Sequence, residues 1–404
     1  MHNLISRLHP PRIGPHFAIP LYPRGIHRRL LGTACAGAAA TVAIASHAAV
    51  AQVTPVDPPG VNVAATQTDL SSPQAAVMQA FNQRFAADVV IPTYVLLVEE
   101  TAQLAAASQQ FAADPTEETL TALRESWVAA TAAWAKGQGF AFGPVHSLGY
   151  SAALEFPADA ASIEVLLTDP ATLEAGNIDA IINAIDRSPS VQGFEAIAYV
   201  LYGVEGDKGL DDFSAVDRLY LTRLAALAEG NARELLQVWQ EGWEGYAPYE
   251  TVLATAGEPG NGAYLSVEAG TEEVIRSLFN HLDVIVSEEL PEMTAAWETE
   301  TILPDAVALE HIRSAVSGIH LAYAGPDESA LETPSGLSYL VALENQLIDR
   351  VIQRSLTAAL RHLETAIANP EEPEVLSQAL HGAHESLAAV HGYMETDVLA
   401  LVQR

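Results

Sequence analysis

The sequence of 404 residues has almost no cysteine and very little lysine. Its single cysteine is Cys35, and its two lysines are Lys136 and Lys208. Cys35 lies in an N-terminal segment with the features of a cleaved leader, so the rest of the chain has no disulfide and no thiolate. Disulfide scaffolds, cysteine-ligated metal sites and cysteine enzymes are therefore excluded for the mature protein.

Basic residues of any kind are scarce, with 19 Lys and Arg against 51 Asp and Glu. Five of the arginines lie in the first 51 residues, which hold no acid, so the remainder carries 14 basic and 51 acidic residues, a net charge of −37. Nucleic acid and anionic lipid are poor partners for such a chain. Adaptation to high salt accounts for the excess of acid, and a cation-binding purpose is the alternative.

The first 51 residues have the features of a secretion signal. Arg28 and Arg29 precede an apolar run from residue 30 to residue 51, which ends in the small residues Ala49, Val50 and Ala51. This order predicts a signal peptide over 1–51, with export by the Sec or the twin-arginine route, and a periplasmic or extracellular protein. No later run of about eighteen apolar residues occurs, so we expect no transmembrane segment after the signal.

The mature chain is predicted to be all-α. Residues 52–75 are rich in proline and polar residues and are typical of a flexible linker. Helical spacing dominates thereafter, and no stretch alternates between apolar and polar residues as a strand would. We therefore expect two packed helical bundles, an N-terminal bundle over 76–258 and a C-terminal bundle over 259–404, which meet near a glycine-rich segment. Because the two predicted bundles are similar in size, they could have arisen by an ancient duplication of one bundle.

Local signals place several helices. The sequence predicts a helix with Asp114 as its N-cap, Pro115 at the first helical position and Glu117 at the third. Pro92 is expected to kink or divide the helix before them. Apolar stripes at three- and four-residue spacing mark three later helices: Leu309, Ile312, Val316, Ile319 and Tyr323; Leu356, Leu360, Leu363 and Ile367; Leu376, Leu380, Ala383, Leu387, Val390, Met394 and Leu401.

The most distinctive segment is 191–206, VQGFEAIAYVLYGVEG, in which one glycine opens an apolar helix and another closes it. Together with other landmarks in the right order, this segment resembles the imelysin family over most of the mature chain. The landmarks are Val90-Ile91-Pro92-Thr93-Tyr94, the pair Trp127 and Trp134, Phe142-Gly143-Pro144, and Phe156-Pro157.

The resemblance implies an exported protein of two helical bundles associated with bacterial iron uptake, in a family with some metallopeptidases. The family motif is Gly-x-His-x-x-Glu, whose two side chains can bind one divalent ion from one helix face. Here Glu195 stands in the place of the histidine and Ala198 in that of the glutamate. A zinc peptidase needs about three protein ligands, so this helix supplies too little and enzymatic activity stays open.

Two interpretations of Glu195 follow. It is an oxygen ligand in a site for iron, calcium or magnesium, joined by acids such as Glu205 or Asp207. Alternatively, it is a relic in a site that no longer binds metal.

A second metal candidate lies in the last helix. His381, His384, His391 and Glu395 share one face, and imidazoles with a carboxylate suit transition metals. This face lies beside the apolar stripe, so a solvated flank of the core is the alternative.

The function that these features favour is an exported imelysin-like protein linked to iron or other metal uptake. It is expected to bind a divalent metal ion, such as iron, calcium or zinc, or a small ligand between the bundles, and another envelope protein is a candidate partner. Two alternatives stay open: a metallopeptidase with unrecognised ligands, and a metal-free helical module that binds a protein or a polysaccharide.

Overall fold

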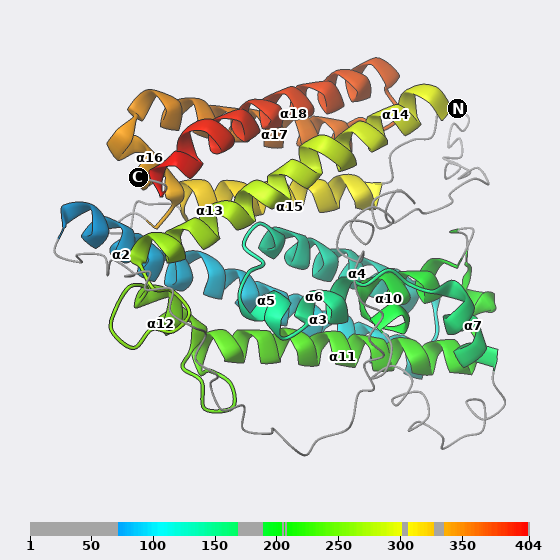
Figure 1. The fold of residues 1–404 in the computed structure, drawn as a ribbon. Coiled ribbons are helices and arrows are strands. Elements are labelled where there is room, and N and C mark those ends of the chain that lie inside the picture. Colours follow the sequence, from blue (N-terminus) through cyan, green and yellow to red (C-terminus); the bar gives the residue numbers. More distant parts are fainter. Residues whose placement is uncertain are drawn as a thin grey trace, which may run out of the picture. The chain divides into compact units, whose positions relative to one another are not determined.

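The computed structural model describes residues 72–168, 189–203, 206, 208–300, 306–326 and 335–402 (Figure 1). The predicted signal peptide over 1–51 and most of the linker over 52–75 lie outside these residues and stay predictions. Within the described ranges the regular structure is helical, apart from one isolated bridge between Trp243 and Tyr246. The all-α prediction is confirmed.

The described chain forms two compact units that are discontinuous in sequence. The first unit comprises Val95–Trp134 and Val145–Leu235, and the second comprises 72–94, Ala135–Pro144 and the chain from Leu236 onward. These units differ from the two continuous bundles that the sequence predicts, because three long helices each begin in one unit and end in the other. An uninterrupted helical stripe gives no sign of such a boundary.

The first unit holds the segment that resembles the family motif. The helices that lie wholly or mostly in it are α3 (Ile91–Ala113), α4 (Glu117–Gln138), α5 (Pro144–Ser147), α6 (Tyr150–Glu155), α7 (Ala160–Thr168), α10 (Gly193–Tyr202) and α11 (Ala215–Gln240), with short 3₁₀ turns η2 (Pro189–Val191) and η3 (Leu210–Asp212). Helix α10 packs against α6 and α7. Its apolar residues are buried, among them Ile197 and Leu201.

Helix α4 begins two residues later than predicted. Thr116, rather than Asp114, caps it, because the Thr116 hydroxyl accepts a hydrogen bond from the backbone N–H of Thr119 (3.2 Å). Glu117 and Glu118 then occupy the first turn, where the helix dipole favours negative charge.

The second unit is built mainly from the C-terminal helices. They are α2 (Pro73–Phe85), α12 (Tyr249–Ala254), α13 (Val267–Val284), α14 (Leu290–Glu300), α15 (Ala306–Ala324), α16 (Leu337–Glu344), α17 (Gln346–Ala368) and α18 (Pro373–Tyr393), with the π-turns η1 (Ala86–Val90), η4 (Ile285–Glu289) and η6 (Met394–Val398) and the 3₁₀ turn η7 (Leu399–Leu401). Helix α17 packs along α18 and α15, as Figure 1 shows.

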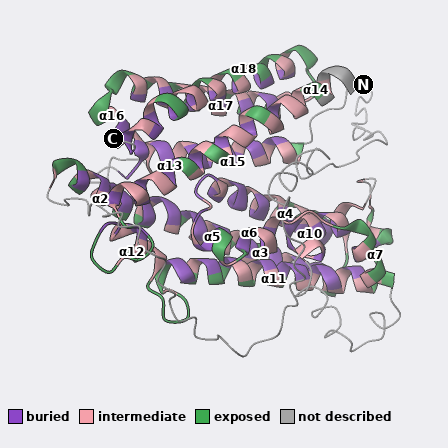
Figure 2. Ribbon diagram, viewed as in Figure 1, coloured by how far each residue is buried: buried purple, intermediate pink, exposed green. Residues whose placement is uncertain are grey.

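Burial confirms two of the three predicted stripes, those of α15 and α18, whose residues are all buried. In α17, Leu356 and Leu363 are buried but Leu360 and Ile367 are half-buried. The buried face of α17 is rotated from the predicted one and consists of Ile352, Leu356, Ala359, Leu363 and Ala366. The exposed residues of this helix include Arg350, Arg354, Thr357 and Arg361. Figure 2 colours the helices by burial.

Pro92 neither ends nor divides its helix. Just before it lies the π-turn η1, after which the N–H of Ile91 bonds to the carbonyl of Ala86. A proline has no N–H to donate, and a widened turn accommodates the missing bond without breaking the helix. The same arrangement recurs at η4, where the N–H of Leu290 bonds to the carbonyl of Ile285 immediately before Pro291.

One helix in the described chain meets the length and composition of a membrane span. It covers Pro73–Ala113, its best 18-residue window has a mean hydropathy of 1.3, and 44% of that window is buried inside the protein. Core helices of water-soluble proteins meet the same criterion. The expectation of no transmembrane segment after the signal therefore stays a prediction.

Candidate functional site

A close contact between the start of α10 and the end of α6 organises the site. Gly193 opens α10 with a φ of +79°, and a Cβ at this position would lie 2.6 Å from the carbonyl oxygen of Leu154 and 3.0 Å from that of Ala153. A residue with a side chain fits neither this backbone conformation nor this space. The glycine of the motif-like segment therefore allows the first turn of α10 to approach the C-terminal end of α6.

Two tryptophans of α4 fix this arrangement. The indole N–H of Trp127 donates to the carbonyl oxygen of Phe194 (3.0 Å), and that of Trp134 donates to Oε2 of Glu155 (2.8 Å). Seven residues, about two helical turns, separate the two indoles, so one face of α4 reaches both α10 and α6. Both rings are buried, and each bond satisfies an indole N–H that burial would otherwise leave without a partner.

The contact brings two carboxylates into one environment. Glu155 is the last residue of α6, and Glu195 is the third residue of α10. Burial, and then the like charge of Glu155, raise the pKa of Glu195 to about 7. The first turn of a helix favours a negative charge, so burial and repulsion outweigh the dipole here. Near neutral pH the Glu195 carboxyl is therefore only partly ionised.

The position of the family's glutamate is part of the core. Ala198 is 1% exposed and lies between the buried residues Ile197 and Val200 on an apolar helix. A carboxylate at this position would have to be buried. Neither α6 nor α10 carries a histidine, whereas His146 of α5 contacts the Ser151 hydroxyl of α6 (Nδ1 to Oγ, 3.2 Å).

The C-terminal end of α10 is anchored by a single arginine. Gly203 ends the helix with a φ of +72°, and Arg124 donates to the carbonyl oxygens of Leu201 (3.0 Å) and Lys208 (2.5 Å). A guanidinium at a helix C-terminus satisfies carbonyls that have no partner within the helix. Arg124 therefore binds the chain both at the end of α10 and at Lys208.

Two residues of the predicted acid set lie in the sequence between Gly203 and Lys208. Glu205 and Asp207 lie outside the described residues. Whether they join Glu195 stays a prediction, as does the choice between a metal ligand and a relic for Glu195 itself.

Tyr199 follows Glu195 by one turn and has its own acidic partner. Its hydroxyl donates to Oε1 of Glu164 on α7 (2.8 Å), and burial together with this carboxylate raises the pKa of Tyr199 to about 12. Sequence reasoning missed this pair and also missed Glu155. The position of Glu155, directly before the landmark Phe156-Pro157, was the available signal for it.

The histidines of α18 bind separate partners in the second unit. His384 donates from Nε2 to the carbonyl oxygen of Val286 (3.1 Å), within the π-turn η4. Nε2 of His391 lies 2.9 Å from Oδ1 of Asp283, and its ring stacks on Phe279 with 4.7 Å between centroids. These two imidazoles therefore hold α18 against α13 and η4.

The other two residues of the predicted histidine face are exposed. His381 contacts the carbonyl oxygen of Ser377 in its own helix (Nδ1 to O, 2.9 Å), and Glu395 lies in η6. Across the residues that the structure describes, no three His, Cys, Asp or Glu side chains lie where they could hold one metal ion.

Comparisons with known proteins identify the same family that the sequence around α10 resembles. A family model described as Imelysin matches residues 90–392. Iron-regulated protein A of Synechococcus elongatus is 27% identical over 342 residues, an alignment that covers 82% of this chain and 88% of that protein.

Two solved structures share the fold. One, provisionally assigned as an iron-regulated protein A precursor from Parabacteroides distasonis, has a TM-score of 0.62 at 17% identity and covers 80% of this chain and 96% of its own. The other, an imelysin-like protein from Psychrobacter arcticus, has a TM-score of 0.57 at 13% identity and covers 81% and 96%. Because the family model spans well over half of the sequence, the chain belongs to the imelysin family.

Proposed function

We propose that this chain is an exported protein associated with iron uptake, and that its first unit binds a cation through Glu155 and Glu195. The observation that carries the proposal is the pair of carboxylates that Gly193 and Trp134 bring together at the family's motif. The curated relative is named an iron-regulated protein, and one structural relative is described as a precursor. The leader with Arg28 and Arg29 agrees with export.

The chemistry of the donors favours an oxygen-loving ion. Carboxylate oxygens suit ferric iron and calcium, whereas structural and catalytic zinc sites rely on imidazole or thiolate ligands. Glu195 and Ala198 replace the histidine and glutamate of the motif, so this helix offers zinc no nitrogen ligand. The role of this chain's residues is to hold and orient the ion, and peptidase activity is not part of the proposal.

Electrostatics support cation binding at this place. Two carboxylates that share a partly buried environment repel each other, which is one reason why the pKa of Glu195 is raised. A bound cation would replace the proton and relieve the repulsion. The net charge of −37 on the mature chain also raises the local concentration of cations.

The test uses the mature protein, beginning near Gln52 and purified without chelator or affinity metal. We expect elemental analysis to find a stoichiometric metal, and the melting temperature to rise with ferric iron or calcium more than with zinc. Glu195→Gln should remove both effects, because it keeps the shape of the side chain and loses the charge.

The matched control is Glu229→Gln, which alters an acid of the same unit that pairs with Arg233 on α11 (2.6 Å) and leaves the site intact. Absence of bound metal, together with a melting temperature that no added ion changes, would refute the proposal. Chelator-sensitive cleavage of an unfolded protein by the wild type would favour a metallopeptidase instead.

A further inference from the structure

Helix α17 concentrates positive charge in a chain that has little of it. Arg350, Arg354 and Arg361 are exposed and lie within twelve residues, although the mature chain has only 14 basic residues. Their spacing of four and seven residues places them on one face, opposite the buried face of the helix. This part of the second unit is therefore a basic stripe on a strongly acidic protein.

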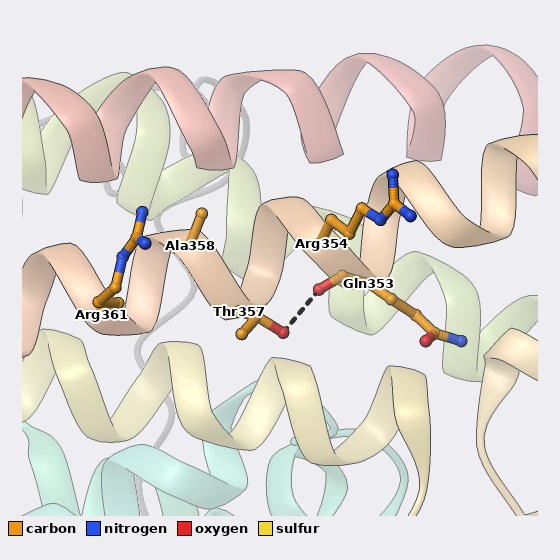
Figure 3. A pocket seen from close by; sticks show the side chains of 5 residues that line it. All are labelled: Gln353, Arg354, Thr357, Ala358 and Arg361. Atoms are coloured by element: carbon orange, nitrogen blue, oxygen red, sulfur yellow. Dashed lines mark hydrogen bonds between the residues drawn. The ribbon is translucent and has the colours of Figure 1, made fainter.

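The stripe borders a hollow in the surface. Five residues of α17 line an open hollow of about 390 Å³: Gln353, Arg354, Thr357, Ala358 and Arg361. Figure 3 shows the side chains of Arg354 and Arg361 leaving the helix on the same side. The Thr357 hydroxyl donates to the backbone carbonyl of Gln353 (2.9 Å). Two small side chains thus separate two guanidinium groups.

The two guanidinium groups at the hollow have no ion pair or hydrogen bond within the described chain. Other exposed arginines do have one: Arg276 pairs with Glu272 (2.5 Å) and Arg233 with Glu229 (2.6 Å). Such pairing of charges is the ordinary state of a surface arginine at helical spacing from an acid. Arg361 departs from this pattern, because Glu364 lies three residues away without an ion pair to it in the described residues, and Arg354 has no acid three or four residues away.

The nearby acids do not neutralise the stripe. Asp349 is buried and accepts hydrogen bonds from the hydroxyl of Ser338 (2.6 Å) and the amide of Gln353 (3.2 Å). It therefore faces the core. Glu364 lies three residues beyond Arg361 and is exposed, without an ion pair to it in the described residues. Two guanidinium groups without an ion pair in the described residues therefore border the hollow.

The spacing selects the kind of anion. A guanidinium binds a carboxylate or phosphate through two parallel hydrogen bonds. Seven residues of helix separate Arg354 from Arg361, about 10 Å along the axis. A small single anion meets one of them, whereas an anion with two or three carboxylates can meet both. We propose that this hollow binds a polycarboxylate anion, either free or as the chelate of a metal ion.

The proposal is independent of the carboxylate pair, because it concerns the second unit. Calorimetric titration of the mature protein with citrate, ferric citrate, acetate and inorganic phosphate tests it. We expect citrate or ferric citrate to bind more tightly than phosphate and acetate, and the comparison of the two identifies the free anion or the chelate as the preferred form.

Variants locate the binding. Arg354→Gln and Arg361→Gln should each weaken citrate binding about fivefold, and the double variant about 25-fold, the scale of exposed charge pairs. Arg354→Lys should recover part of the loss, because it restores charge without the planar pair of donors. Arg276→Gln, which removes an exposed arginine of α13, should change nothing, and all variants should melt like the wild type.

Three results would overturn the proposal. The first is no measurable citrate or ferric citrate binding by the wild type. The second is phosphate binding as tight as that of citrate, which would indicate a simple anion site. The third is an unchanged affinity in the double variant, which would place the anion elsewhere.

Discussion

Replacing Glu195 with glutamine tests the electrostatics of the site through the pH dependence of stability. The folded pKa of Glu195 is about 7, against an ordinary value of 4.5. Each unit of pKa difference corresponds to about 1.4 kcal/mol, so the ionised carboxylate destabilises the fold by about 3 to 4 kcal/mol at most. Partial exposure and relaxation of Glu155 reduce this, and we expect about 2 kcal/mol.

The sign follows from where the proton is held. A raised pKa means that the folded protein keeps a proton that the unfolded chain releases. The stabilisation from this protonation is complete below about pH 4.5 and is lost as the pH rises through 7. Glu195→Gln behaves like the protonated acid at every pH, so it should match the wild type near pH 5 and exceed it near pH 8.

The assay is thermal unfolding of both proteins near pH 5 and pH 8, with chelator present so that metal does not contribute. At pH 8 the variant should melt about 4 °C higher, the shift expected for this free energy in a protein of this size. Glu229→Gln provides the control, since a surface acid changes little with pH. Equal melting temperatures at both pH values, or a less stable variant at pH 8, would refute the electrostatic argument.

Three further predictions concern stability. Gly193→Ala should destabilise the protein by about 3 kcal/mol, because its Cβ would meet the backbone of Leu154. Gly149 has a similar φ but open space around it, so Gly149→Ala should cost only about 1 kcal/mol. Denaturant unfolding of the two variants measures the difference in their free energies of unfolding. Burial and the nearby His311 lower the pKa of His281 to about 3. The free energy of unfolding should therefore fall below pH 6.5, by about 2 kcal/mol at pH 5. Thermal unfolding at pH 7 and pH 5 measures this fall, which His281→Gln should abolish. Buried Asn82 donates to the carbonyl of Val267 (3.2 Å), so Asn82→Ala should lower the unfolding free energy by about 2 kcal/mol, and an unchanged value would show that the bond contributes nothing.

Helical periodicity predicted the fold class because each stripe depends on residues close in sequence. The stripes of α15 and α18 were correct in full, and that of α17 was displaced by part of a turn. The start of α4 was two residues early, because Asp114 and Thr116 both fit an N-cap and only the backbone decides between them. The sequence predicts a kink or a break at Pro92, because it does not show whether a π-turn will form before a proline.

The candidate site was less predictable because it depends on contacts between segments distant in sequence. Glu195 was identified from its place in the motif. Its neighbour Glu155 is 40 residues earlier, in a helix of six residues with no apolar stripe of its own. The histidines of α18 lie on one helix face as predicted, yet His384 and His391 bind Val286 and Asp283 instead of a shared ligand. A shared helix face shows which side chains are near one another but not which neighbouring helix they meet.

The structure separates the part of the motif that shapes the site from the part that supplies its chemistry. Gly193 is needed for the approach to Leu154, and Trp127 holds the backbone carbonyl of Phe194, so neither contact involves the side chains at positions 195 and 198. The helix can therefore keep its place while those side chains change. Under the proposed function, glutamate at position 195 offers an oxygen donor where the family motif has nitrogen, which would favour a different class of metal ion on the same scaffold.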